Sequence, residues 1–315
     1  MSRRHRDEGT GRRTVLTAGA GGIAALIGLS AFGSRDASGA PAAPAVKQAA
    51  KPLIIAHRGL SDIWPQHTMQ AYKAARAVGD DIVVEADVFA SSDGVLFCRH
   101  DELLADSTDV RERFPAQAEA KVWELKAAQL EQLTGTGGDP ALQDGPEPSP
   151  EDLRVPRFAR FLDYAVAEGV RVYVETKHAQ AVAPLKRLLA EKLSRTTPDL
   201  YVESFVAQHL RDIGFSELRN RTRLMQEIPD DAALREIAGY ASVFAPAAKT
   251  ATRSTVARIH AAGLEVHVHG LEEAGLPESD RDSYTALLNA GVDGIFTDRC
   301  DVGKRALDGW LADER

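Results

Sequence analysis

Histidine, arginine and carboxylate side chains recur where apolar, strand-like runs of this sequence end. The first run ends in His57-Arg58, and the second carries Glu85 and Asp87. Carboxylate oxygens suit a hard divalent cation, and an arginine can bind a phosphate through two parallel hydrogen bonds. Histidine can take up or release a proton near neutral pH. This combination of residue types predicts chemistry at a phosphorus centre.

Groups of the same kinds follow along the chain. His100 ends the third run, and the next brings Glu175 and Lys177. We expect Glu175 to hold one Ca²⁺ or Mg²⁺ ion with the carboxylates of the second strand, and Lys177 to bind phosphate with Arg58. Each motif alone has an ordinary explanation as an exposed pair of acids, a hydrogen-bonded strand end or a surface ion pair. A functional site is favoured because these motifs all lie at the ends of strand-like runs.

Short β-rich runs alternate with amphipathic helical stretches from residue 52 onward, which predicts a parallel sheet. The runs are 53–58, 82–88, 95–100, 170–176, 201–205, 223–227, 242–246, 264–270 and 294–298. In a closed barrel the carboxyl ends of parallel strands meet at one mouth. We therefore expect the candidate residues to gather there.

The third run is one strand too many for an eight-stranded barrel. The link before it is too short for a parallel crossover, and it contains Asp93-Gly94, a pair typical of two-residue hairpin turns. The fold predicted is thus an α/β TIM barrel with an added antiparallel hairpin strand. This turn would place Asp87 opposite His100, and a turn shifted by one residue would place Glu85 there. Both registers put the imidazole on the face of the two carboxylates.

The segment 103–156 interrupts the βα rhythm with many Gly, Pro and Asp residues. We interpret it as an inserted cap over one barrel mouth, because long insertions in compact domains are often functional lids. A loose surface insertion is the alternative. The barrel domain would extend over 52–315, after a linker at 41–51.

The first 40 residues have a different composition. Arg12-Arg13 precede a Gly/Ala-rich apolar stretch, and small residues surround Ala40. This pattern is typical of a twin-arginine export signal. We expect cleavage near Ala40 and a mature protein outside the cell, in the periplasm or in the cell-wall space. A membrane anchor is disfavoured by the many glycines and the missing basic flank, so no stable membrane insertion is expected after cleavage.

Charge and cysteine content exclude other classes. The first 40 residues contain six arginines and three acidic residues, so the remaining chain carries a formal charge of −11. Nucleic-acid binding is not expected, because phosphate backbones require clustered Lys and Arg. Two cysteines, Cys98 and Cys300, form no disulfide framework. We expect free or buried thiols, with pairing after export as the alternative.

Several stretches together resemble the glycerophosphodiester phosphodiesterase family over residues 52–302. They are AHRG, PQHT, AYKAARAVGDDIVVEADV, SSDGVLFCRHDELLADSTDV, YVETK, ESF and AGVDGIFTD. The resemblance, closest to the exported periplasmic-type branch, implies a TIM barrel that hydrolyses glycerophosphocholine-like diesters to glycerol 3-phosphate and an alcohol. It implies one divalent cation. By motif, it assigns the acid/base pair to His57 and His100, phosphate to Arg58 and Lys177, and the metal to Glu85, Asp87 and Glu175.

The sequence departs from this family at three places. Gln66 stands where a glutamate is usual, and we interpret it as a supporting residue that tunes the site. HVHG supplies His267 and His269 in place of an aromatic-Thr pair. These histidines are expected to line the mouth and shape specificity, with zinc ligation as a minor alternative. Thr176 is a mild change.

Two alternative functions are compatible with the same barrel fold. The same chemistry could act on a polymeric or lipid diester such as teichoic acid or a lysophospholipid, rather than on a small-molecule phosphodiester. A catalytically silent barrel that binds a phosphorylated ligand is the remaining option. The sequence leaves open the oligomeric state and whether water or a substrate hydroxyl attacks phosphorus.

Overall fold

The computed structural model describes residues 51–192, 200–214, 218 and 220–313. Eight parallel strands close into a barrel in the order β1-β9-β8-β7-β6-β5-β4-β2, and β1 pairs with β2 to complete the ring. The predicted TIM barrel is confirmed. The predicted signal segment 1–40 and the linker up to residue 50 lie outside the described residues. The strands are β1 (Leu53–Ala56), β2 (Val83–Ala90), β4 (Arg171–Thr176), β5 (Leu200–Ser204), β6 (Asn220–Met225), β7 (Val243–Pro246), β8 (Glu265–Val268) and β9 (Gly294–Thr297).

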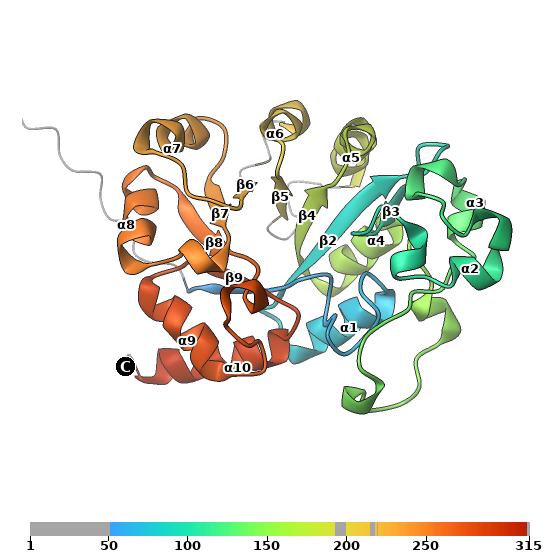
Figure 1. Cartoon of the computed structure of the whole chain (residues 1–315), viewed down its shortest axis with the longest axis horizontal. Helices are drawn as coiled ribbons and strands as arrows, with labels where there is room; N and C mark the ends of the chain where they lie inside the picture. Colours follow the sequence, from blue (N-terminus) through green and yellow to red (C-terminus); the bar gives the residue numbers. More distant parts are fainter. Residues whose placement is uncertain (1–50, 193–199, 215–217, 219, 314–315) are drawn as a thin grey trace, which may run out of the picture. The chain divides into compact units, whose positions relative to one another are not determined.

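Helices surround the barrel and cover the outer faces of its strands (Figure 1). Every residue of β2 is buried, since one face packs on helices and the other fills the barrel. Val84, Ala86 and Val88 belong to the outer core, whereas Val83 belongs to the inner one. The helices are α1 (Met69–Val78), α4 (Phe158–Glu168), α5 (Ala179–Lys192), α6 (Ala207–Ile213), α7 (Asp231–Ala238), α8 (Arg253–Ala261), α9 (Arg281–Ala290) and α10 (Cys300–Asp313).

A layer of large side chains fills the middle of the barrel. Tyr173 and Tyr201 stack there with ring centroids 4.5 Å apart. The Tyr173 hydroxyl lies 2.7 Å from both Thr222 Oγ1 and His267 Nδ1, so these three buried polar groups find partners within the layer. The apolar part of the layer consists of Ile55, Val83, Tyr173, Tyr201, Val243 and Phe296. Side chains two residues further along the strands lie above this plug, at the mouth.

The ninth strand, β3 (Leu96–Cys98), pairs antiparallel with β2 as predicted, but in a different register. Val88 lies opposite Cys98, and the Arg99 N–H donates to the Asp87 carbonyl. The loop therefore holds three residues instead of two, and it ends in Gly94 at φ +80°, a geometry usual in three-residue hairpins.

This shift corrects the predicted facing of the imidazole. A one-residue slip moves every side chain to the other face of a strand. Neither expected register occurs, and Arg99 instead of His100 follows the inward face beside Asp87. Arg99 is buried, whereas His100 lies just beyond the strand and reaches the site from the loop.

The insertion builds a small core of its own against the β2–β3 hairpin. Its helical pieces are η1 (Leu104–Asp106), α2 (Val110–Arg113), η2 (Pro115–Gln117), η3 (Val122–Glu124), α3 (Ala127–Leu130), η4 (Pro140–Leu142) and η5 (Pro150–Leu153). They pack around Phe89 and Phe97 of the hairpin. Trp123 stacks on His178 at 4.9 Å, and Gln143 donates to the Ile63 carbonyl. The insertion thus contacts two loops at the barrel mouth.

Both cysteines are free and buried, in agreement with the expected unpaired thiols. Cys98 lies on β3 and Cys300 begins α10. Among the helices of the described ranges, none is long and apolar enough to cross a membrane.

The chain leaves β1 through a left-handed turn. Arg58 has φ +61° and Gly59 has φ +91°, a region that costs residues with a Cβ atom free energy. A Cβ atom at Gly59 would lie 2.7 Å from the carbonyl carbon of Ala71 in α1. The glycine thus lets the turn pack directly against this helix.

We expect Gly59→Ala to lower the free energy of unfolding by about 3 kcal/mol or more, through strain plus the clash with Ala71. Gly94→Ala is the matched control, because Gly94 has φ +80° but open space around its Cβ position. It should cost about 1 kcal/mol. Urea unfolding of the two variants measures both values, and equal losses would contradict the role of close packing at Gly59.

Candidate active site

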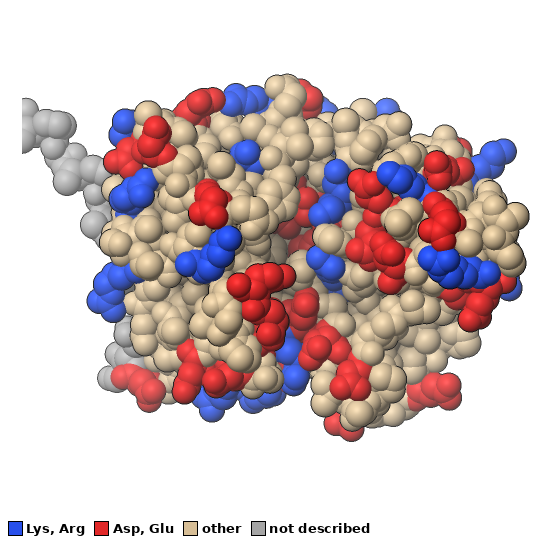
Figure 2. All heavy atoms as spheres, viewed as in Figure 1, with Lys and Arg blue, Asp and Glu red and all other residues tan. Residues whose placement is uncertain are grey.

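The carboxyl ends of the barrel strands bring most of the predicted site residues together. In Figure 2, acidic side chains lie recessed in a hollow near the middle of the view, with basic side chains beside them. The residues linked by the contacts below are His57, Arg58, Gln66, Glu85, Asp87, His100, Glu175 and Lys177.

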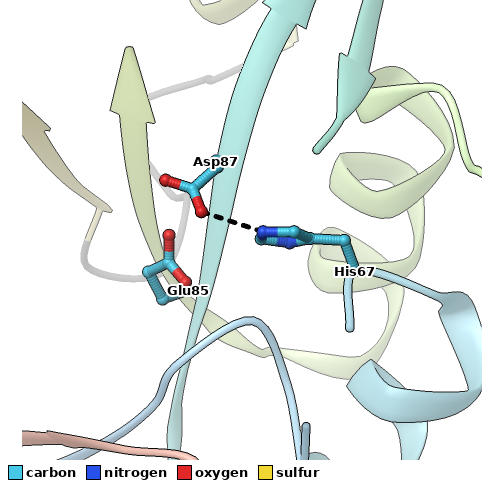
Figure 3. Close-up of side chains that lie close together, drawn as sticks. All are labelled: His67, Glu85 and Asp87. Atoms are coloured by element: carbon cyan, nitrogen blue, oxygen red, sulfur yellow. Dashed lines mark hydrogen bonds and ion pairs between the residues drawn. The ribbon is translucent and has the colours of Figure 1, made fainter. Parts of the chain in front are cut away.

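Glu85 and Asp87 point from the same face of β2 into the barrel. With His67 they offer ligand atoms that all lie within 4.8 Å of one another, and all three residues are buried (Figure 3). Glu175 is the register partner of Asp87 on β4. Lys177 Nζ lies 3.1 Å from Glu175 Oε2 and 3.7 Å from Asp87 Oδ1, so one ammonium group lies beside both carboxylates. The structure therefore brings the three predicted metal ligands together.

Asp87 is contacted by two cationic side chains and by an imidazole. Its Oδ2 lies 2.9 Å from His67 Nε2 and 3.6 Å from Arg58 Nε, and its Oδ1 lies 3.7 Å from Lys177 Nζ. Burial opposes ionisation of Asp87, but Lys177, His67 and Arg58 together hold its pKa well below the usual range. Asp87 is thus a buried carboxylate that keeps its charge.

His67 positions Asp87. Its Nε2 contacts the carboxylate, and its Nδ1 lies 2.9 Å from the Tyr72 hydroxyl. Burial lowers the pKa of His67 to about 3, so the imidazole is neutral. In that state Nε2–H donates to Asp87 and Nδ1 accepts from Tyr72. Both ring nitrogens are engaged within the protein, which fits a supporting residue better than a metal ligand.

Glu85 and Glu175 have fewer partners than Asp87 that would stabilise their ionised forms. Glu85 Oε2 accepts the Arg58 N–H at 2.7 Å, and Glu175 Oε2 accepts from Lys177 Nζ at 3.1 Å. Burial, followed by repulsion from Asp87, raises the pKa of both glutamates well above the usual range. A buried set of carboxylate oxygens with surplus negative charge fits a hard divalent cation such as Ca²⁺ or Mg²⁺.

His57 forms a pair with a residue at the other end of the barrel domain. Its Nδ1 lies 2.7 Å from Asp298 Oδ1, just after β9. The Ser61 hydroxyl donates to the same carboxylate at 2.8 Å. Burial, then the charge of Arg58, lowers the pKa of His57 below 6.5, and Asp298 offsets this in part. The imidazole is thus neutral at pH 7 and oriented by a carboxylate.

Gln66 connects Arg58 to Asp101, which contacts His100. Its Oε1 accepts from Arg58 Nη1 at 2.8 Å, and its Nε2 donates to Asp101 Oδ2 at 2.8 Å. Asp101 Oδ1 in turn lies 2.9 Å from His100 Nδ1. An amide can accept on one side and donate on the other, whereas an ionised carboxylate can only accept. Gln66 therefore fits its place beside Asp101 as a supporting residue.

The two histidines of HVHG lie at different depths. His267 is fully buried in the aromatic layer, hydrogen-bonded to Tyr173, so the expectation that it lines the mouth is wrong. The strand alternation places both histidines inward, but His267 lies two residues deeper. His269 is partly exposed, with its ring 5.9 Å from that of Phe205 and its Nε2 3.4 Å from the Met225 carbonyl.

A fourth buried carboxylate, Glu203, joins the cluster. It lies on β5 opposite Glu175 in the sheet and is 2% exposed. Burial, then repulsion from Glu85 and Glu175, raises the pKa of Glu203 well above the usual range. The motif ESF did not mark this residue as part of a site, because a single glutamate on a strand is commonplace.

Sequence reasoning therefore missed three polar residues around the site: His67, Asp298 and Glu203. The sequence contained a local indication for each of them. Glu203 lies within the predicted strand 201–205, Asp298 ends the predicted strand 294–298, and His67 follows Gln66 in PQHT. What the sequence lacked was the pairing of each with its partner, across sequence separations of 20 residues for His67 and 241 for Asp298.

Comparisons with known proteins agree with this arrangement. The model of the glycerophosphoryl diester phosphodiesterase family matches residues 57–302. A glycerophosphodiester phosphodiesterase of Bacillus subtilis is 26% identical over 271 residues, which cover 82% of this chain and 87% of the relative. Another, of Haemophilus influenzae, is 24% identical over 337 aligned positions and covers 82% of this chain and 90% of its own.

Solved structures share the fold. A phosphodiesterase of Oleispira antarctica, in complex with the product sn-glycerol-3-phosphate, superimposes with a TM-score of 0.68 at 22% identity and covers 82% of this chain and 97% of its own. A second structure, from Silicibacter pomeroyi, superimposes with a TM-score of 0.66 at 21% identity and covers 82% of this chain and 93% of its own.

We expect Gln66→Glu to lower kcat/KM about 10-fold at pH 8, the size typical for residues that orient ligands. The introduced carboxylate would face Asp101, and the repulsion would disturb both Arg58 and His100. At pH 5 the loss should shrink, because a protonated carboxyl group can again donate to Asp101.

Gln143→Glu provides the control, since Gln143 is also in a mouth-facing segment but donates to a backbone carbonyl. Steady-state kinetics on a phosphodiester at both pH values give the comparison. Equal kinetics for Gln66→Glu and the unaltered protein at pH 8 would contradict the bridging role.

Proposed function

The chain belongs to the glycerophosphoryl diester phosphodiesterase family and is a phosphodiesterase of that class, and on this premise we propose how its site works. The reaction is hydrolysis of small glycerophosphodiesters to glycerol 3-phosphate and an alcohol, with one divalent cation and two histidines. The observation that carries the proposal is the convergence of Glu85, Asp87 and Glu175 beside Arg58 and Lys177.

Arg58 and Lys177 bind the phosphodiester. The left-handed turn fixes the Arg58 backbone, since its N–H donates to Glu85 while Nη1 donates to Gln66. The guanidinium keeps further donors for phosphate oxygens. Lys177 is partly buried and adds a second positive charge beside the carboxylates. Charge that develops on the nonbridging oxygens is thus stabilised by cations already in place.

Glu85, Asp87 and Glu175 would hold the divalent cation. When bound, the cation supplies charge stabilisation for the phosphate oxygens. The residues of the chain prepare this place: His67 orients Asp87, and the aromatic layer under the mouth keeps the carboxylates dry. All-oxygen donors favour Ca²⁺ or Mg²⁺ over zinc.

His57 suits the general base. Its imidazole is neutral at pH 7, and Asp298 holds Nδ1, which directs Nε2 away from the carboxylate to take a proton. His100, oriented by Asp101 on the other side of Gln66, is then the acid that protonates the leaving alcohol. Water or a neighbouring substrate hydroxyl can serve as nucleophile in this arrangement.

We propose the substrate class from the proteins that this chain resembles. The relatives of B. subtilis and H. influenzae are glycerophosphodiester phosphodiesterases, and the O. antarctica structure contains the product sn-glycerol-3-phosphate. We therefore expect a small diester in preference to a teichoic acid or a lysophospholipid.

Release of glycerol 3-phosphate from glycerophosphocholine tests the proposal. We expect activity that a chelator abolishes and that Ca²⁺, Mg²⁺ or Mn²⁺ restores. His57→Ala and His100→Ala should each lose at least about 100-fold in kcat, the usual contribution of general acid–base catalysis. His260→Ala is the control, because His260 pairs with Asp293 at an exposed position on α8.

The result that would overturn the proposal is no activity with any of the three metals, or full activity in His57→Ala. Teichoic acid and lysophospholipid are assayed in parallel, and a higher kcat/KM on either would replace the small diester as substrate.

Asp298→Asn should shift the acid limb of the pH profile of kcat/KM. Asp298 raises the pKa of His57 toward 6.5, so its removal lowers that pKa further and moves the limb to lower pH. The plateau value of kcat should fall as well, because the imidazole loses its orienting partner. An acid limb that stays in place would show that His57 is not the base.

We also propose that residues 1–40 export the protein through the twin-arginine pathway. The double variant Arg12→Lys and Arg13→Lys should leave an uncleaved precursor inside the cell, whereas Arg3→Lys with Arg4→Lys, the other arginine pair of this segment, should not. Cell fractionation and N-terminal sequencing of the exported chain measure both. Export of the first variant at the normal level would contradict this proposal.

A further inference from the structure

Glu203 lies at the level of the metal-binding carboxylates and faces the interior of the barrel. Tyr201, two residues earlier on β5, belongs to the inner layer, so the alternation of side chains turns Glu203 inward as well. Its register partner is Glu175. Glu203 therefore lies directly above the aromatic layer, next to a residue assigned to the metal.

The carboxylate of Glu203 is buried without a matching donor. It is 2% exposed, and its Oε2 has no hydrogen-bond partner among the described residues. The nearest polar group on the next strand, the Thr222 hydroxyl, is engaged by Tyr173. Buried polar atoms are nearly always satisfied, so this buried carboxylate oxygen is available to bind a ligand.

The charges that act on Glu203 are those of the candidate site. They include the acidic residues Glu85, Glu175 and Asp87 and the cation Lys177. Arg58 adds a second cation to the cluster through Asp87. With all four carboxyl groups ionised, the cluster would carry two negative charges more than Lys177 and Arg58 offset, which equals the charge of one divalent ion.

We propose that Glu203 is a fourth carboxylate ligand of the metal centre, and that it makes this centre selective for Ca²⁺ over Mg²⁺. The inference rests on the metal site of the proposed function and extends its ligand set. Ca²⁺ takes six to eight oxygen ligands in flexible geometry, and its affinity rises with the number of charged ligands. Mg²⁺ demands a near-octahedral shell and keeps several waters, so an extra carboxylate from the barrel interior benefits it less.

Calorimetric titration of the metal-free protein with Ca²⁺ and with Mg²⁺ tests the assignment. Glu203→Gln keeps the size of the side chain and removes its charge. We expect the Kd for Ca²⁺ to rise at least about 10-fold in this variant, with a smaller change for Mg²⁺. Glu175→Gln should weaken binding of both ions.

Thermal unfolding gives a second readout that does not depend on activity. Without metal, Glu203→Gln should have a higher Tm than the unaltered protein, because one buried and repelled carboxylate is gone. The rise in Tm on adding Ca²⁺ should be smaller in the variant, since less binding energy stabilises the native state. A variant with a higher metal-free Tm is folded, which separates loss of binding from loss of structure.

Glu265→Gln is the matched control. Glu265 is the first residue of β8, so the same substitution is made at the opposite end of the barrel strands. Its Kd values for Ca²⁺ and Mg²⁺ should equal those of the unaltered protein.

The outcomes separate the two proposals. If Glu175→Gln loses Ca²⁺ binding while Glu203→Gln stays within twofold of the unaltered Kd, the fourth ligand is wrong and the metal site of the proposed function stands. If Glu203→Gln loses Ca²⁺ and Mg²⁺ binding equally, the selectivity is wrong. If the unaltered protein binds neither ion, both the metal centre and its extension fall.

Discussion

The crowding of buried carboxylates at one barrel mouth is the constraint on which the rest of the site depends. Each of these groups is costly to bury as an ion unless a partner compensates its charge. Asp87 has such partners in the cations Arg58 and Lys177, and the neutral imidazole of His67 donates a hydrogen bond to it, so it keeps its charge. The glutamates around it have fewer partners that would compensate a negative charge. Among the described residues, Oε2 of Glu203 has no hydrogen-bond partner. Such a site fits the divalent cation and the phosphate of the proposed function.

The barrel brings the carboxylates together at one mouth and excludes solvent from the side below them. The layer around Tyr173 and Tyr201 closes the interior directly below the carboxylates, so solvent cannot relax their repulsion from that side. Closure of the ring also makes β1 and β9 neighbours. Since both strands end at the same mouth, His57 meets Asp298 at 2.7 Å although 241 residues separate them.

The length of the hairpin loop and the amide at Gln66 determine which side chains lie beside His100 and Arg58. A three-residue loop ending in Gly94 places Arg99, instead of His100, on the inward face. His100 then reaches the site from the loop, held by Asp101, and the amide of Gln66 links that carboxylate to Arg58 in the turn after β1. The glutamate usual in the family would meet a second carboxylate here, which gives the substitution a physical reason.

The sequence by itself determined the alternation of strands and helices, the closed barrel with one antiparallel strand, and the strand ends that carry His57, Glu85 and Glu175. These features follow from local periodicity and turn residues, which neighbouring positions encode. The tertiary structure alone decided the hairpin register, the depth of His267 and the partners of the site residues. Register depends on the conformation of a single glycine, and depth depends on how neighbouring strands are staggered in the ring. Partners come from strands far apart in the chain, and no local pattern specifies which of many carboxylates will meet a given imidazole.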